Sequence, residues 1–206
     1  MITLQATSED AVSGSTLTSA ARRVWAAVRI GLGGMFLWAF ADKTFALGYP
    51  TGRSFDGSAG VETIDYLGES AWLFGFGEGS PTFSFLTFRS EGWFIEWAQS
   101  AAGEAWADWL FMAGLLFVGT TFLLGVGLRL GAVVGAAMLV LHFLASPDFL
   151  ASPVTAIPAG SEPYLDIPLI TALTLVGLAL IDAGNTWGLG RRWERASLVE
   201  KYPILR

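Results

Sequence analysis

The sequence of 206 residues contains no cysteine, only one histidine and few charged side chains, which make up 15% of the chain. The lack of cysteine excludes disulfides, thiol relays and thiolate-bound metal or iron–sulfur centres. One histidine is too few for a haem held by two histidine ligands, and no metal-ligand spacing stands out. We therefore expect no built-in metal or cofactor, so that any redox role needs a bound small molecule or a second subunit.

Apolar and aromatic residues are abundant in the chain, whereas charged residues are few. Hydrophobic residues form 53% of the chain, which includes 15 Phe and 9 Trp. A soluble domain of this size normally carries more charge, whereas abundant Trp and Phe suit a protein with two membrane–water interfaces. The net charge of −6 gives no reason to expect a nucleic-acid partner. The composition predicts a protein whose main partner is the lipid bilayer.

The first apolar run, at residues 24–47, is long enough to be a retained membrane span. At about 1.5 Å per residue its helix would measure about 36 Å, against a hydrocarbon core of about 30 Å. Its charged residues stand near the two ends, with Arg29 at the start and Asp42 and Lys43 at the finish. Because a charge in a span is costly unless it snorkels, pairs or lines a cavity, we expect other helices to supply partners.

Three further apolar runs follow, at residues 109–126, 130–144 and 167–181. Gly125, Gly127 and Arg129 predict a tight turn between the second and third spans. Glycines at positions 127, 131 and 135 are spaced by four, which is typical of close helix packing in membranes. The sequence thus predicts an all-α membrane protein with a four-transmembrane-helix bundle. The bundle covers residues 24–184, between a disordered N-terminus at 1–23 and a basic tail at 185–206.

The stretch between the first two spans, residues 48–107, is an acidic and aromatic-rich insert. Eight acidic residues stand against only two basic ones, Arg53 and Arg89. Aromatic residues that include Trp93 and Trp97 recur at helical spacing, with polar residues between them. This pattern predicts a short amphipathic helix that lies in the membrane interface or caps the bundle.

The basic residues predict the orientation. Arg22, Arg23, Arg129 and the basic tail fall on one side of a four-span arrangement. The acidic insert and the proline-rich connection at residues 146–166 fall on the other. We expect a multi-pass protein of a bacterial inner (plasma) membrane, with both termini cytoplasmic and the insert extracytoplasmic.

This topology brings together two groups of polar residues. On the cytoplasmic side, Arg29 and Asp182 are expected to form a structural ion pair that locks the first helix to the fourth. On the outer side stand Asp42, Lys43, His142 and Asp166. In one interpretation these four are caps and pairs, with Lys43 bound to Asp166 and His142 bonded to a backbone carbonyl.

In the other interpretation the outer group is a ligand pocket with Lys43 and His142 as its catalytic residues. Lys43 would attract an anion or a quinone oxygen, and His142 would donate a hydrogen bond or a proton to the quinone. Asp42 and Asp166 complete the pocket. The ligand-binding side chains of the insert are Arg53, Arg89, Trp93 and Trp97, of which the two tryptophans would stack on a flat ring.

Several segments resemble the actinobacterial branch of the DoxX/DoxD family. They are VRIGLGGMFLWAFADKTF, GSPTFSFLTF, ADWLFMAGLLFVGTTFLLGVGLRLGAVVGAAM and DAGNTWGLGRRWE, and the resemblance covers residues 22–206. Arg29 and Lys43 match family positions. The resemblance implies a four-helix membrane bundle. It also implies an activity like that of the DoxD subunit of thiosulfate:quinone oxidoreductase, which works with a second redox subunit, or a place in a membrane complex that handles oxidative stress.

Two functions remain open at this point. In the first, the chain is a redox subunit that passes electrons from a small sulfur compound such as thiosulfate to membrane quinone. Lys43, Arg53 and Arg89 would steer the anion, against the net negative charge of the insert. In the second, the chain is a non-catalytic scaffold that anchors a partner or an oxidoreductase complex through its exposed aromatic insert.

Overall fold

The computed structural model describes the chain in several stretches. Three of the predicted site residues, Arg89, Trp93 and Asp166, lie outside them, as do the proline-rich connection at residues 146–166 and the first 16 residues of the predicted disordered N-terminus. The described residues are 17–49, 51–56, 61–73, 79–88, 90, 95–145, 167–202 and 205.

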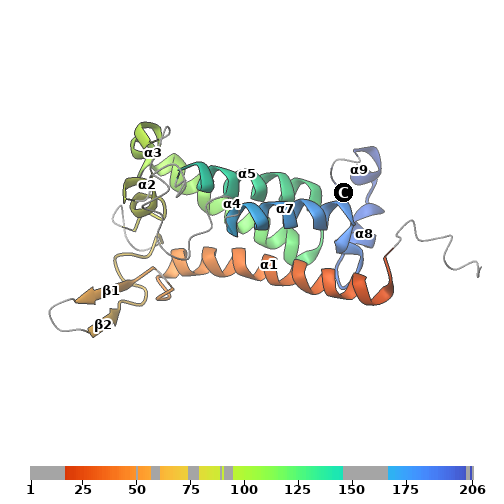
Figure 1. Ribbon diagram of the computed structural model, residues 1–206, viewed down its shortest axis with the longest axis horizontal. Coiled ribbons are helices and arrows are strands. Elements are labelled where there is room, and N and C mark those ends of the chain that lie inside the picture. Colours follow the sequence, from red (N-terminus) through yellow and green to blue (C-terminus); the bar gives the residue numbers. More distant parts are fainter. Residues whose placement is uncertain are drawn as a thin grey trace, which may run out of the picture.

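The described part is mainly helical, and its four longest helices run alongside one another (Figure 1). Three of them have the length and apolar composition to cross a membrane, which makes the chain a multi-pass membrane protein. The fourth has 14 residues and a length of about 21 Å. The three long helices are α1 (Ser19–Phe45), α4 (Ala105–Leu124) and α5 (Leu128–Ala145), and the shorter one is α7 (Ile167–Leu180).

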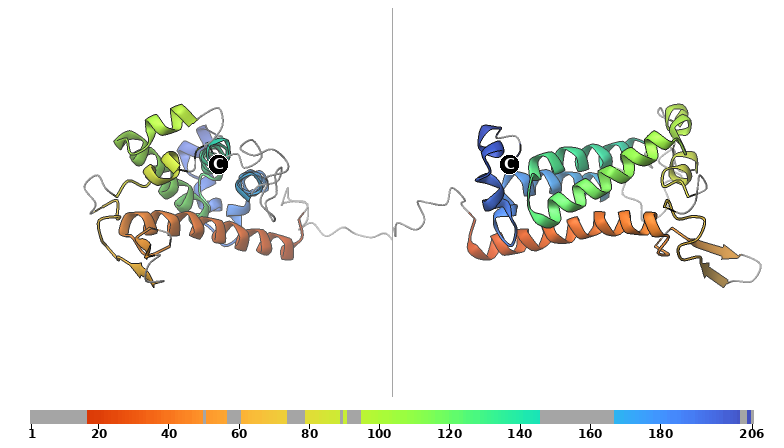
Figure 2. Two further views of the ribbon diagram at one scale, coloured as in Figure 1. Left: turned by 60° about the vertical axis from the view of Figure 1, so that its left-hand side comes forward. Right: turned by 180° about the vertical axis from the view of Figure 1, so that it is seen from behind.

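Helix α4 is the centre of the packing. It packs against α1 on one side and α5 on another, and α5 in turn packs against α7 (Figure 2). Met112, Val118 and Phe122 of α4 are fully buried in this core, together with Leu175 of α7. Large apolar side chains also cover the outer faces of the helices. In a bilayer these faces meet hydrocarbon chains, so their exposure is the normal condition of a membrane bundle.

Glycines allow the helices to approach closely. A methyl group added at Gly33 of α1 would meet the backbone of Leu123 in α4. One added at Gly135 of α5 would meet Leu175 and Val118, and Gly131 faces α4 in the same way. The predicted close packing at these two α5 positions is confirmed. The predicted turn before α5 is confirmed too, with Gly125 and Gly127 at φ of 72° and 61°.

The insert folds at one end of the bundle. It forms an antiparallel hairpin, β1 (Arg53–Asp56) and β2 (Val61–Ile64), which the sequence analysis did not predict. Two short helices follow, α2 (Phe83–Phe88) and α3 (Ile95–Ala101). Helix α3 lies where the sequence predicted a short helix, and it buries Ala98 and Ala101 while Glu96, Gln99 and also Trp97 are exposed.

The C-terminal segment folds at the opposite end. It forms η3 (Ala183–Asn185), α8 (Gly190–Glu194) and α9 (Ser197–Lys201), where the sequence predicted only a basic tail. The beginning of α1 lies at this same end (Figure 1). Helix α1 starts at Ser19, inside the stretch predicted to be disordered, because Thr18 caps it by accepting a hydrogen bond from the Ala21 amide at 3.2 Å.

Candidate functional site

Arg29 joins three segments of the chain at the end that carries α8. Its side chain is fully buried, and its guanidinium donates only to backbone carbonyl oxygens. Nη1 donates to Phe122 O and, at 2.9 Å, to Leu123 O. Nη2 donates to Thr186 O at 3.4 Å and Trp187 O at 3.1 Å. One side chain of α1 thereby fastens the last turn of α4 and the loop after η3.

Glycines make room for this guanidinium. A methyl group added at Gly125 would lie 2.9 Å from Arg29 Nη1, and one added at Gly188 would lie 3.1 Å from Nη2. Gly184 packs directly against the backbone of Gly125. Side chains at these positions would push the carbonyls away from Arg29, so the glycines belong to the arginine site.

These contacts give Arg29 partners other than Asp182, with which the sequence predicted an ion pair. In the described part of the chain the partners of Arg29 are carbonyl oxygens, whereas Asp182 is exposed at the end of α7, beside the Gly125–Gly127 turn. The last carbonyls of a helix have no partner within the helix and carry its negative dipole end. The carbonyl oxygens at the end of α4 therefore supply the buried guanidinium with the negative charge that a carboxylate would have supplied.

Asp42 has a structural role at the insert end. Its side chain is 1% exposed, and its two oxygens accept from the Tyr49 amide at 2.7 Å and the Thr51 amide at 3.0 Å. These bonds fold the chain back directly after α1 and lead it into β1. Asp42 thus behaves as a cap, in line with the first interpretation of the outer group.

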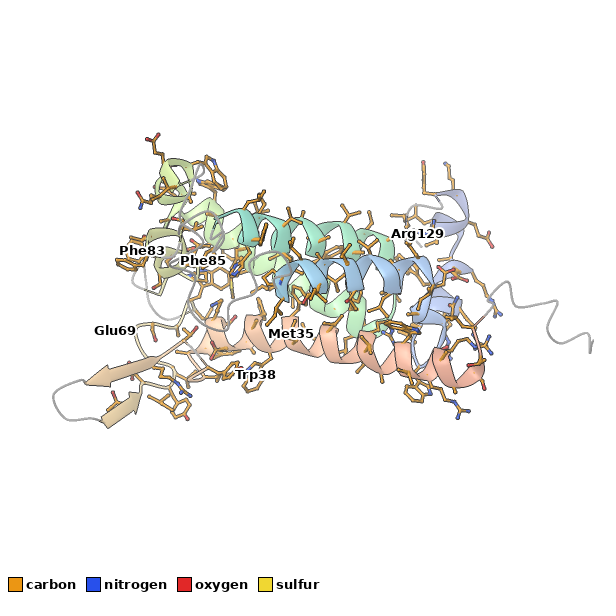
Figure 3. The ribbon with its side chains drawn as sticks, in the orientation of Figure 1. Met35, Trp38, Glu69, Phe83, Phe85 and Arg129 are labelled. Carbon is orange, nitrogen blue, oxygen red and sulfur yellow. The ribbon has the colours of Figure 1, made fainter. Side chains whose placement is uncertain are left out.

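Lys43 and His142 both lie toward the insert end, but on helices that are separated by α4. The Lys43 ammonium lies 6.0 Å from the centre of the Phe111 ring in α4. The His142 ring is exposed and stacks on Phe85 of α2, with 4.2 Å between ring centres and 11° between planes. Phe83 and Phe85 mark this end in Figure 3, and Arg129 marks the other. A cavity shared by Lys43 and His142 stays a prediction.

The other predicted ligand-binding residues that the structure describes are exposed on the insert. Arg53 of β1 donates from Nε to Gly48 O at 2.9 Å. Trp97 of α3 is 54% exposed. The structure places both at the insert end without bringing them into one site.

The sequence analysis missed a polar cluster around Asp108, which stands between the predicted insert and the predicted second span. Its Oδ1 accepts from Ser80 Oγ at 2.8 Å, Thr82 Oγ1 at 2.6 Å and the Thr82 amide at 3.2 Å. Asp108 lies in the first turn of α4, so the cluster fastens the start of α2 to that helix. The signal was present, since acidic residues favour first turns and Ser and Thr favour helix starts.

A cavity of about 230 Å³ lies beside this cluster. Trp72 and Trp109 form one of its walls, with ring centres 4.7 Å apart and planes at 74°. Neither Lys43 nor His142 lines it. The lining residues are Trp72, Leu73, Gly79, Ser80, Gly103, Ala105, Asp108 and Trp109.

A search for metal-ligand groups and three comparisons with known proteins complete the description of the site. Across the residues that the structure describes, no group of three or more His, Asp or Glu side chains is placed to hold a metal ion. Comparison of the chain with models of protein families, with curated proteins and with solved structures finds no match.

Proposed function

We propose that this chain is a DoxX-like, four-helix subunit of the inner (plasma) membrane that anchors a partner protein of a membrane redox system at its outer face. One observation carries the proposal: the buried charged side chains of the described bundle fasten loops to helices. Arg29 holds the loop after η3, Asp42 holds the turn into the hairpin, and Asp108 holds α2.

The bonds of Arg29 and Asp42 favour anchoring over catalysis, because a catalytic group needs a free side toward its substrate. At the insert end, Asp42 and Asp108 stabilise a folded insert that presents apolar side chains outward. Phe88 of α2 is 74% exposed and Trp97 of α3 is 54% exposed. Large apolar side chains gathered on a surface outside the spans are typical of a protein-binding face.

The placement of charge supports the proposed topology. Arg22, Arg23, Arg129 and the basic residues of α8 and α9 gather at the end where α1 begins. Basic residues next to spans mark the cytoplasmic side. With α7 as the fourth span, both termini are cytoplasmic and the insert is extracytoplasmic.

A second function is favoured by the surroundings of His142. In this function the chain passes electrons from a small sulfur compound such as thiosulfate to membrane quinone, which takes up two electrons and two protons. His142 is exposed on α5 beside Phe85, toward the lipid in which quinones dissolve. An imidazole there can donate to a quinone oxygen or pass it a proton, and Lys43 and Arg53 can attract the anionic donor.

Purification of the tagged chain from its source membrane in mild detergent separates the two functions. The proposal expects a stoichiometric partner polypeptide that is lost from the Phe88→Ser/Trp97→Ser variant. The matched control is Trp38→Ser, which removes a half-exposed tryptophan from the outer side of α1 (Figure 3). The partner should remain bound to this control.

The result that would overturn anchoring is catalysis by the chain alone. If the purified chain reduces quinone with thiosulfate, and His142→Leu abolishes the reaction while the fold is kept, the electron-transfer function holds instead. Loss of the partner from the Trp38 control would also contradict a specific docking face on the insert.

A further inference from the structure

The cavity beside Asp108 has features that anchoring a partner does not require. We infer that it binds an organic ammonium group, with the Asp108 carboxylate as its counter-ion and the two tryptophans as its walls. The inference is independent of the proposed function, because it rests on one buried carboxylate and the space beside it.

Asp108 supplies a buried negative charge. Asp108 is 7% exposed, and no basic side chain is recorded in ion-pair contact with it among the residues that the structure describes. A buried negative charge without a cation is costly, and a bound cation removes that cost. Arg29 and Asp42, the other buried charges, have their partners in the backbone, which leaves Asp108 as the buried charge that faces a cavity.

The two carboxylate oxygens of Asp108 differ, because Oδ1 accepts hydrogen bonds and Oδ2 is available to a ligand. All three recorded donors, from Ser80 and Thr82, meet Oδ1. Within the described stretches, Oδ2 has no recorded donor, and it is not among the atoms that are both buried and without a partner, so solvent reaches it. Since Asp108 lines the cavity, Oδ2 is the atom that can accept a hydrogen bond from a ligand there.

The walls suit a cation more than an anion or a neutral ring. Trp72 and Trp109 meet edge to face, and both line the cavity. The face of an indole carries partial negative charge and attracts ammonium groups. A carboxylate beside indole faces repels the phosphate or sulfur anions that the insert could otherwise meet. The cavity, at about 230 Å³, has room for a small alkylammonium group.

The level of the cavity indicates where the ammonium comes from. Asp108 lies in the first turn of α4 and Trp109 directly follows it, at the end where the proposed topology has the helix enter the membrane, and Trp106 and Trp109 are both more than half exposed. Tryptophans at this level lie among lipid headgroups. The ammonium can therefore belong to the headgroup of an aminophospholipid or to a small free amine, and the experiment distinguishes these two sources.

Binding to the full chain in detergent tests the inference. The probes are short-chain phosphatidylethanolamine and phosphatidylcholine, their free headgroup amines ethanolamine and choline, and phosphatidylglycerol of the same chain length. We expect one ammonium-bearing molecule per chain by native mass spectrometry and calorimetry. Phosphatidylglycerol, which lacks an ammonium group, should bind at least tenfold more weakly than the ammonium lipid it matches. Binding of the amines alone assigns the site to a soluble amine, and binding of the lipids alone assigns it to a headgroup.

Variants connect the binding to this cavity. Asp108→Asn keeps an acceptor for Ser80 and Thr82 but removes the charge, and it should weaken ammonium binding about tenfold or more. Trp109→Leu removes a wall without touching the cluster and should weaken binding about tenfold. The matched control is Trp106→Leu, which removes an exposed tryptophan of the same turn outside the cavity and should leave binding unchanged.

Two results would overturn the inference. One is equal binding of phosphatidylglycerol and the ammonium lipids, or binding of none of the probes. The other is an unchanged ammonium affinity in Trp109→Leu, which keeps the test decisive even if Asp108→Asn fails to fold.

Discussion

The two ends of the bundle differ in how much space lies beside their buried charges. At the α8 end, Arg29 is surrounded by backbone carbonyls and glycines, and the neighbouring cavity measures only about 20 Å³. At the insert end, Asp42 and Asp108 hold surface loops, and the neighbouring cavity measures about 230 Å³. One end is closed by main-chain contacts, and the other keeps open space beside a carboxylate. This difference is the reason that we place the proposed partner and ligand sites at the insert end.

The largest effect is expected from cysteine labelling, which tests whether the two ends of the bundle lie on opposite sides of the membrane. The chain has no cysteine, so single cysteines report cleanly. Glu69→Cys, at an exposed position near the hairpin (Figure 3), should react with an impermeant thiol reagent in intact cells. Ser197→Cys, exposed on α9, should react only after lysis. The reverse pattern would place the insert in the cytoplasm.

The next largest effect is expected at the α8 end of the bundle. Arg29→Met removes the donor to four carbonyl oxygens and should lower the free energy of unfolding by about 3–5 kcal/mol, measured in detergent. Asp182→Asn should cost less than about 1 kcal/mol, because the carboxylate is exposed and is not a partner of Arg29. A loss of several kcal/mol in Asp182→Asn would restore the ion pair that the sequence suggested.

Two adjacent glycines test the contact between α1 and α4. Gly33→Ala would drive a methyl group into the backbone of Leu123 and should cost about 1–3 kcal/mol. Gly34→Ala has nothing within 4 Å of the added methyl group, so the better helix propensity of alanine should leave stability equal or raise it by up to about 1 kcal/mol. Equal losses in the two variants would mean that the helices do not cross at Gly33.

The smallest effect is expected at the insert end of the bundle. Asp42→Asn replaces one of two acceptors with a donor that faces the Tyr49 or Thr51 amide, and it should cost about 1–2 kcal/mol in thermal unfolding. Glu69→Gln, an exposed neutral counterpart on the same insert, should change stability by less than about 0.5 kcal/mol. An unchanged stability in Asp42→Asn would show that the turn into β1 holds without its cap.

The helices of the fold could be predicted from the sequence because long apolar runs leave little choice in a bilayer. The runs at residues 24–47 and 109–126 became α1 and α4 with shifts of a few residues at their ends. The hairpin β1–β2 was missed because each strand has only four residues, too few for a clear alternation of polar and apolar side chains.

The sites were harder to predict, and for a physical reason. The partners of Arg29 are carbonyl oxygens, which every residue carries and which no side-chain pattern reveals. A search for opposite charges therefore led to Asp182 instead. Asp108 was missed because its partners Ser80 and Thr82 come from a loop 26 to 28 residues earlier in the chain. Only the fold brings these groups together.

The contacts of Arg29 also constrain how the protein is made. Thr186 and Trp187 follow Arg29 by 157 and 158 residues, so the first helix enters the membrane long before the ribosome has produced these partners. Until then only Nη1 can reach its acceptors, Phe122 O and Leu123 O of α4, and Nη2 needs water or lipid headgroups as partners. Completion of the C-terminal segment fixes the depth of the first helix. A chain that stops before residue 186 lacks both acceptors of Arg29 Nη2 and keeps part of this cation unsatisfied.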